Sequence, residues 1–195
     1  MDEETRVWLM ARKLPRFLTG NEVLEMFRVA NGKRDLVLLK SLYYLGLRNS
    51  EAQKMMVDDV DAINKTVKVV QGKRGKDRYV PIPEGFAQDL KEWIGARKKG
   101  PLFEGRHGEK GMLSDRHIRR LVKNYAMLAN VRKYEEIHPH TLRHSYATHL
   151  QNKGVPLNII QNMLGHENIE TTTIYTHMGL DQARGYVEKA FEDFE

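Results

Sequence analysis

The hydrophobic period of this chain changes only once, and that change limits the folds open to it. Along most of the 195 residues, apolar side chains recur at helical spacing. Between residues 66 and 82, "TVKVV" and "RYVPI" are instead rich in β-branched and aromatic residues, and a Gly- and Lys-rich turn separates them. This pattern predicts one β-hairpin over 66–82. We therefore predict a mainly α fold with a small antiparallel β-sheet, in the α+β class.

Capping residues and apolar spacing define the helices. Thr19 followed by Glu22 is a capping-box pattern and predicts a helix start near residue 20. Ser114 is a typical N-cap and predicts a helix that runs to about residue 130. The other predicted helices cover residues 34–46, 84–97, 140–153 and 156–165, a short segment around Tyr175, and the tail 181–195.

Positive charge is concentrated in the middle of the chain. The formal net charge is +6, but residues 61–133 alone carry 18 basic and 8 acidic side chains. Such clustering indicates a polyanion as partner, nucleic acid first of all, whereas the ordinary alternative is a solvated Lys-rich surface. The chain has no cysteine, no signal-peptide pattern and no apolar run long enough for a membrane span. These features favour a cytoplasmic protein.

The segment "HPHTLRHSYATHL", residues 138–150, groups several side chains that could bind an anion. His140 and Arg143 are three residues apart on a predicted helix and so share one face. The planar guanidinium matches phosphate oxygens, and an imidazole can donate to a further oxygen. His140 and His144 also have metal-ligand spacing, but no third ligand stands at a zinc-like distance in the sequence. We therefore expect no metal and no other cofactor.

Four further residues are ambiguous when taken singly. Arg48 in "GLRNSE" could face a cleft, or it could be a helix-terminal charge with a local ion pair. Lys73 lies at the predicted hairpin tip, where exposed lysines are common. His166 in "LGHE" follows a helix end, and Tyr175 in "TTTIYTH" could be a packing residue or a nucleophile.

Taken together and in this order, the motifs resemble the tyrosine recombinases, the phage-integrase and Xer-type family. The resemblance rests on "GLRNSE", "GKRGKDRYVPI", "HPHTLRHSYATHL" and "LGHENIETTTIYTH", and it runs from about Pro15 to His177. It implies the tyrosine-recombinase catalytic-domain fold over residues 1–180, with 181–195 as a C-terminal tail helix. The chain begins almost at this domain, so we expect it to lack the family's usual N-terminal DNA-gripping domain.

The resemblance implies metal-independent DNA cleavage and rejoining through a 3′-phosphotyrosine. Tyr175 would be the nucleophile, and His140 would transfer its proton. Positive groups must bind the non-bridging oxygens, because the phosphodiester repels nucleophiles. The implied catalytic set is Arg48, Lys73, His140, Arg143, His166 and Tyr175, with Lys73 as the acid for the leaving 5′-oxygen. The implied DNA contacts from the basic block are Lys73, Arg74, Lys76, Arg78, Arg116, Arg119 and Arg120.

The expected partner is double-stranded DNA, with self-association in a tetrameric synapse through the C-terminal helix. Three alternatives stay open. A type IB-like topoisomerase would use the same chemistry on one strand. A non-catalytic helix–turn–helix regulator is suggested by "ATHLQNKGVPLNIIQNML", which has Gly154 at the turn. A metal-dependent nuclease would be sensitive to chelators.

Overall fold

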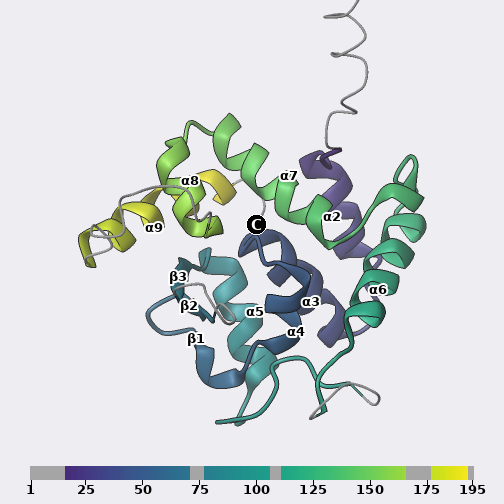
Figure 1. The fold of residues 1–195 in the computed structure, drawn as a ribbon, viewed down its shortest axis with the longest axis horizontal. Coiled ribbons are helices and arrows are strands. Elements are labelled where there is room, and N and C mark those ends of the chain that lie inside the picture. The colour runs from purple at the N-terminus through teal and green to yellow at the C-terminus, as the bar shows by residue number, and fades with distance from the viewer. Residues whose placement is uncertain (1–15, 71–76, 106–110, 166–176, 193–195) are drawn as a thin grey trace, which may run out of the picture.

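The computed structural model describes residues 16–70, 77–105, 111–165 and 177–192 (Figure 1). The described part is mostly helical and has one small antiparallel sheet, so the predicted fold class is confirmed. The helices are α2 (Gly20–Arg28), α3 (Lys33–Tyr44), α4 (Asn49–Lys54), α5 (Glu84–Ile94), α6 (Asp115–Leu128), α7 (Pro139–Asn152), α8 (Leu157–Leu164) and α9 (His177–Phe191). Short 3-10 turns cover Val57–Asp59 and Tyr134–Glu136.

The sheet contains the predicted hairpin and one strand that the sequence analysis did not find. Strands β2 (Thr66–Val69) and β3 (Arg78–Pro81) are antiparallel, with Val69 opposite Arg78. The additional strand β1 (Val60–Asp61) pairs with the outer edge of β2. It has only two residues, which is too short to show an alternating pattern in the sequence.

Helix α3 forms the centre of the core. Its side chains are buried around nearly its whole circumference, as in Leu38, Leu39, Leu42 and Tyr43, which have no exposed surface. It contacts α2, α4, α5 and α7, and Figure 1 shows these helices around it. Because α3 is packed against helices on several sides, its C-terminal end is held in place. The turn that follows this end leads directly into the candidate site.

Two predicted N-caps are present. The Thr19 hydroxyl accepts from the Glu22 N–H at 3.2 Å, and the Glu22 carboxylate accepts from the Thr19 N–H at 2.8 Å, which completes a capping box on α2. The Ser114 hydroxyl accepts from the His117 N–H at 3.2 Å at the start of α6. None of the described helices is both long and apolar enough to cross a membrane.

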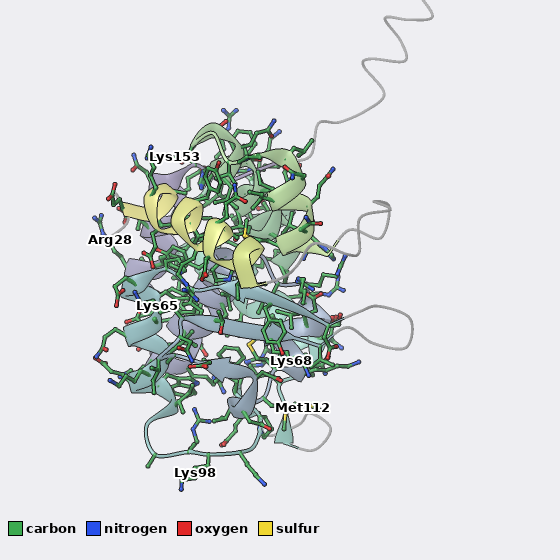
Figure 2. All side chains as sticks on the ribbon, turned by 90° about the vertical axis from the view of Figure 1, so that its left-hand side faces the viewer. Arg28, Lys65, Lys68, Lys98, Met112 and Lys153 are labelled. Carbon is green, nitrogen blue, oxygen red and sulfur yellow. The ribbon has the colours of Figure 1, made fainter. Side chains whose placement is uncertain are left out.

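Helix α9 packs on the body of its own chain. It begins at His177, four residues before the predicted start, and buries Ala183, Val187, Ala190 and Phe191. The Phe191 ring lies 5.0 Å from the ring of Tyr44 and stacks on that of Tyr146 at 5.9 Å. A polar edge adds a hydrogen bond of 2.9 Å from Arg184 Nη2 to the carbonyl of Asn64. Figure 2 shows α9 crossing above the strands, close to Lys65.

Candidate active site

A tight turn after α3 brings Arg48 to the start of α4. Gly46 in this turn has φ +56°, and a Cβ there would lie 2.8 Å from side-chain carbons of both Leu164 and Tyr146. Only glycine fits such a close approach in this backbone conformation. Arg48 is the N-cap of α4, and its N–H donates to Glu51 Oε2 at 2.7 Å. Arg48 thus begins a short helix and does not end the preceding one.

The Glu51 carboxylate is shared by three arginines. Arg48 Nη1 donates to Oε1 at 2.9 Å. Arg78 binds both oxygens, with Nη1 at 2.8 Å from Oε1 and Nη2 at 2.9 Å from Oε2. Arg143 Nη1 lies 3.8 Å from Oε2. Glu51 has 8% of its surface exposed, so these charges interact with little screening by water.

The same three arginines bind three consecutive carbonyls at the end of α8. Arg78 Nε donates to the Met163 carbonyl at 2.7 Å. Arg143 Nη2 donates to that of Leu164 at 2.5 Å, and Arg48 Nη2 to that of Gly165 at 3.1 Å. The last carbonyls of a helix have no partner within it and carry the negative end of the helix dipole, so cations suit them. Arg143 Nη1 also donates to the Gly46 carbonyl at 2.6 Å.

The arginines keep Glu51 ionised. Burial alone would raise the pKa of Glu51, but the hydrogen bonds and charge of Arg78, the N–H of Arg48 and the charge of Arg143 lower it to about 2. For Arg143, burial and the neighbouring charge of Arg48 lower the pKa to about 10, while Glu51 opposes that change. Arg143 therefore stays protonated at neutral pH, and the cluster carries more positive than negative charge.

His140 lies near the start of α7, where the charges of the cluster act on its imidazole. Its side chain is exposed, and its ring lies 6.1 Å from that of His138, edge to face. Desolvation of the ring lowers the pKa of His140, and the charges of His138, Arg143, Arg119 and Arg48 lower it further. The neutral imidazole, which can accept a proton, is therefore favoured at neutral pH.

Of the predicted catalytic residues, the structure brings Arg48, His140 and Arg143 close to one another. Of the other residues predicted to be catalytic, Lys73, His166 and Tyr175 lie outside the described residues, and so do Arg74 and Lys76 from the predicted DNA contacts. Within the described ranges, no three histidine, aspartate or glutamate side chains gather as metal ligands do.

The remaining predicted DNA contacts divide into two groups. Arg116, Arg119 and Arg120 are exposed on α6, where Arg119 Nε binds Asp115 at 2.7 Å. Arg78 is different, because it is 9% exposed and all three of its guanidinium nitrogens donate within the chain. These internal contacts leave the Arg78 guanidinium little surface with which to reach DNA. The sequence analysis assigned no role to Glu51, although its carboxylate lies at the centre of the cluster.

Comparisons with known proteins all point to the tyrosine recombinases and integrases. Residues 16–180 match the phage integrase family. The tyrosine recombinase XerA of Thermococcus kodakarensis is 40% identical over 184 residues, which are 92% of this chain and 64% of the relative. The chain spans about three fifths of the length of the curated relatives it matches, with 59% and 64% for two of them.

Solved structures have the same fold. The crystal structure of a XerA recombinase has a TM-score of 0.73 at 25% identity, and the match covers 96% of this chain and 68% of that one. The XerH site-specific recombinase, bound to its difH substrate in a pre-cleavage complex, has a TM-score of 0.67 at 25% identity. That match covers 93% of this chain and 53% of the other.

Proposed function

The chain belongs to the phage integrase family, and we propose that it is the catalytic domain of a site-specific DNA recombinase that cuts and rejoins strands through a 3′-phosphotyrosine. The observation that carries the proposal is the cluster of Arg48 and Arg143 around Glu51 and the end of α8, with His140 beside it. Within this proposal, residues 1–180 form the catalytic domain and 181–195 its tail.

The cluster suits a phosphodiester because its positive charge is in place before the substrate arrives. Arg48 keeps 35% of its side chain exposed and can meet a non-bridging oxygen from solvent. Arg143 is nearly buried, but each of its terminal nitrogens donates only one of the hydrogen bonds described, and Nη1 is 3.8 Å from Glu51. Donors that are already oriented toward developing negative charge lower the barrier without reorganisation.

In the proposed reaction, Tyr175 Oη attacks the phosphorus, and the bond from phosphorus to the 5′-oxygen breaks. His140 takes the tyrosine proton, and Lys73 protonates the leaving oxygen. His166 adds a donor to the phosphate. The new phosphotyrosine conserves the energy of the diester, so attack by a 5′-hydroxyl of another strand rejoins the DNA without ATP or a metal.

DNA binding in this proposal uses the exposed arginines of α6 and the basic residues Lys73, Arg74 and Lys76. Asn49, which follows Arg48, donates through Nδ2 to the carbonyl of Asp115 at 3.3 Å, so the start of α6 borders the site. The XerH relative whose structure contains its difH substrate supports duplex DNA as the ligand. A chain that acts on cellular DNA needs access to it, and we propose a cytoplasmic location.

We further propose that the protein assembles as a tetrameric synapse on DNA, with α9 of one protomer seated on the next. In the single chain, α9 occupies the aromatic seat formed by Tyr43, Tyr44 and Tyr146 of its own body. An identical seat exists on every copy, so an exchange would preserve these contacts. Deletion of residues 183–195 should leave cleavage measurable but reduce strand exchange sharply. Equal strand exchange by the truncated and intact chains would contradict the assembly role.

The function is tested with a nicked suicide substrate, which releases a short fragment on cleavage and so traps the covalent complex. The intact chain should give a DNA adduct that resists SDS, and Tyr175→Phe should give none. An adduct that survives in the variant would refute the assigned nucleophile.

The adduct assay, together with EDTA treatment and assays of supercoil relaxation and strand exchange, separates the rival functions. A helix–turn–helix regulator would bind DNA but give no adduct, and Tyr175→Phe would change nothing. A metal-dependent nuclease would lose its activity in excess EDTA and regain it with one divalent ion. A topoisomerase would give the adduct and relax supercoils, but it would not exchange strands between two duplexes.

A further inference from the structure

Arg78 is a buried arginine for which the proposed reaction has no role. It is the first residue of β3 and lies opposite Val69 in the hairpin. Successive side chains of a strand point to opposite faces, so Arg78 shares the inward face with Val80, which is fully buried, while Tyr79 between them is exposed. A buried charge of this kind is costly unless it is paired, so its contacts need an explanation.

Those contacts connect three separate parts of the site. Arg78 binds both carboxylate oxygens of Glu51 on α4, at 2.8 and 2.9 Å, and the carbonyl of Met163 near the end of α8 at 2.7 Å. A bidentate pair fixes the plane of the carboxylate as well as its position. Glu51 in turn holds Arg48 through both the N–H of its backbone and Nη1.

We propose that Arg78 is a positioning residue that holds Glu51, and through Glu51 the guanidinium of Arg48, in the orientation that receives the scissile phosphate. This inference rests on the proposed function. Arg78 itself touches no DNA, because its guanidinium is enclosed by Glu51 and the end of α8. Without it, Glu51 would lose the only guanidinium among the described residues that binds both of its oxygens, and only the N–H and Nη1 of Arg48 would still hold the carboxylate plane.

The orientation depends on the shape of the guanidinium as well as on its charge. A lysine at position 78 would keep the positive charge next to Glu51, but an ammonium cannot bind two oxygens in one plane and reach the Met163 carbonyl as well. Arg78→Lys is therefore the informative variant, since it leaves no unpaired buried carboxylate. A displacement of a catalytic group by about 1 Å can reduce the rate roughly 100-fold.

The test compares Arg78→Lys with the intact chain in three measurements. The first is the rate of adduct formation on the suicide substrate at saturating DNA, which should fall about 10- to 100-fold. The second is DNA affinity over a series of salt concentrations, which should keep both its value and its slope. The third is NMR of the Arg48 guanidinium, whose restricted rotation in the intact chain should become faster in the variant.

The matched control is Arg28→Lys, because Arg28 is exposed at the edge of the molecule, as Figure 2 shows, and pairs only with Glu25 at 2.5 Å among the contacts described. It should change none of the three measurements. A phosphate contact needs a variant without the charge, because a lysine would still neutralise the phosphate. A salt slope that becomes shallower by about 0.9 in Arg78→Gln would mean that Arg78 binds a phosphate, and it would overturn the inference.

Two further outcomes separate this inference from the function on which it rests. An unchanged adduct rate together with unchanged Arg48 dynamics in Arg78→Lys refutes the positioning role and leaves the recombinase function standing. If the intact chain forms no adduct, the recombinase function fails. The NMR measurement still decides whether Arg78 orders Arg48 in that case, because it needs no DNA.

Discussion

Glu51→Gln should destabilise the protein at neutral pH, and the loss should shrink as the pH falls. Glutamine has nearly the same shape as glutamate but no charge, so the substitution mimics permanent protonation. It leaves Arg78 and Arg143 buried without their counter-ion. Removal of one partner from a buried ion pair typically costs about 3–5 kcal/mol, because the remaining charge is uncompensated.

The lowered pKa of Glu51 gives a second estimate of how much its charge contributes to the free energy of unfolding. It falls from 4.5 to about 2 on folding, and each tenfold change in proton affinity corresponds to about 1.4 kcal/mol. A lowered folded-state pKa stabilises the protein above the unfolded-state pKa, and this contribution disappears as the pH falls through the folded-state value. Ionised Glu51 should therefore contribute about 3 kcal/mol at pH 7, less than half of that at pH 3 and very little below pH 2.

Urea unfolding of the intact chain and of Glu51→Gln, repeated between pH 3 and pH 7, measures this difference directly. Glu25→Gln is the control, because its exposed pair with Arg28 should be worth less than about 1 kcal/mol at any pH. A Glu51→Gln deficit that stays constant from pH 7 to pH 3, or that is below about 1 kcal/mol at pH 7, would refute the account of the cluster.

Three other sets of substitutions test separate parts of the structure. Gly46→Ala should destabilise by about 1–3 kcal/mol in urea unfolding and should slow adduct formation, because the new Cβ would lie 2.8 Å from Leu164 and Tyr146 and would displace the carbonyl that binds Arg143. Replacement of the exposed α6 arginines by glutamine should weaken DNA binding. It should also reduce the salt dependence of the affinity by about 0.9 log units per log unit of salt for each phosphate that is no longer neutralised. An unchanged salt dependence would mean that α6 does not contact DNA. These arginines are Arg116, Arg119 and Arg120. Phe191→Ala should lower the free energy of unfolding by about 3–5 kcal/mol, because the ring fills the aromatic seat of α9, and a decrease below about 1 kcal/mol would mean that the seat contributes little.

The helices and the hairpin were predictable because their signals are local. Apolar spacing located α3, α5, α6, α7 and α8, and the capping box at Thr19 located the start of α2. Helix α4 was not predicted, because "NSEAQK" has six residues, which is less than two turns, and only one apolar side chain. Such a helix depends on tertiary contacts, here on Glu51 and its arginines, and a periodic pattern cannot reveal it.

The burial of Arg78 was missed for a different reason. In the sequence it is one of four basic residues between positions 73 and 78, and composition suggested that all of them face DNA. The alternation of the strand contained the correcting signal, since Val80 and Arg78 must lie on the same face and Val80 is apolar. The alternation of the strand could not identify the ion-pair partner of Arg78. Glu51 lies 27 positions away in the sequence and meets Arg78 only in the folded chain.

The end of α8 explains why residues so distant in sequence form one site. Its carbonyls at Met163, Leu164 and Gly165 bind three arginines that come from β3, α7 and the start of α4. Backbone carbonyls cannot be altered by a side-chain substitution, so this part of the site withstands mutation as long as the helix ends at the same residue. Gly165 fixes that end, because it adopts φ +67°, which favours glycine. Conversely, a change that lengthens α8 by even one residue would rotate these carbonyls and displace all three arginines together. The position of this helix end therefore determines the geometry of the cluster as much as the arginines themselves do.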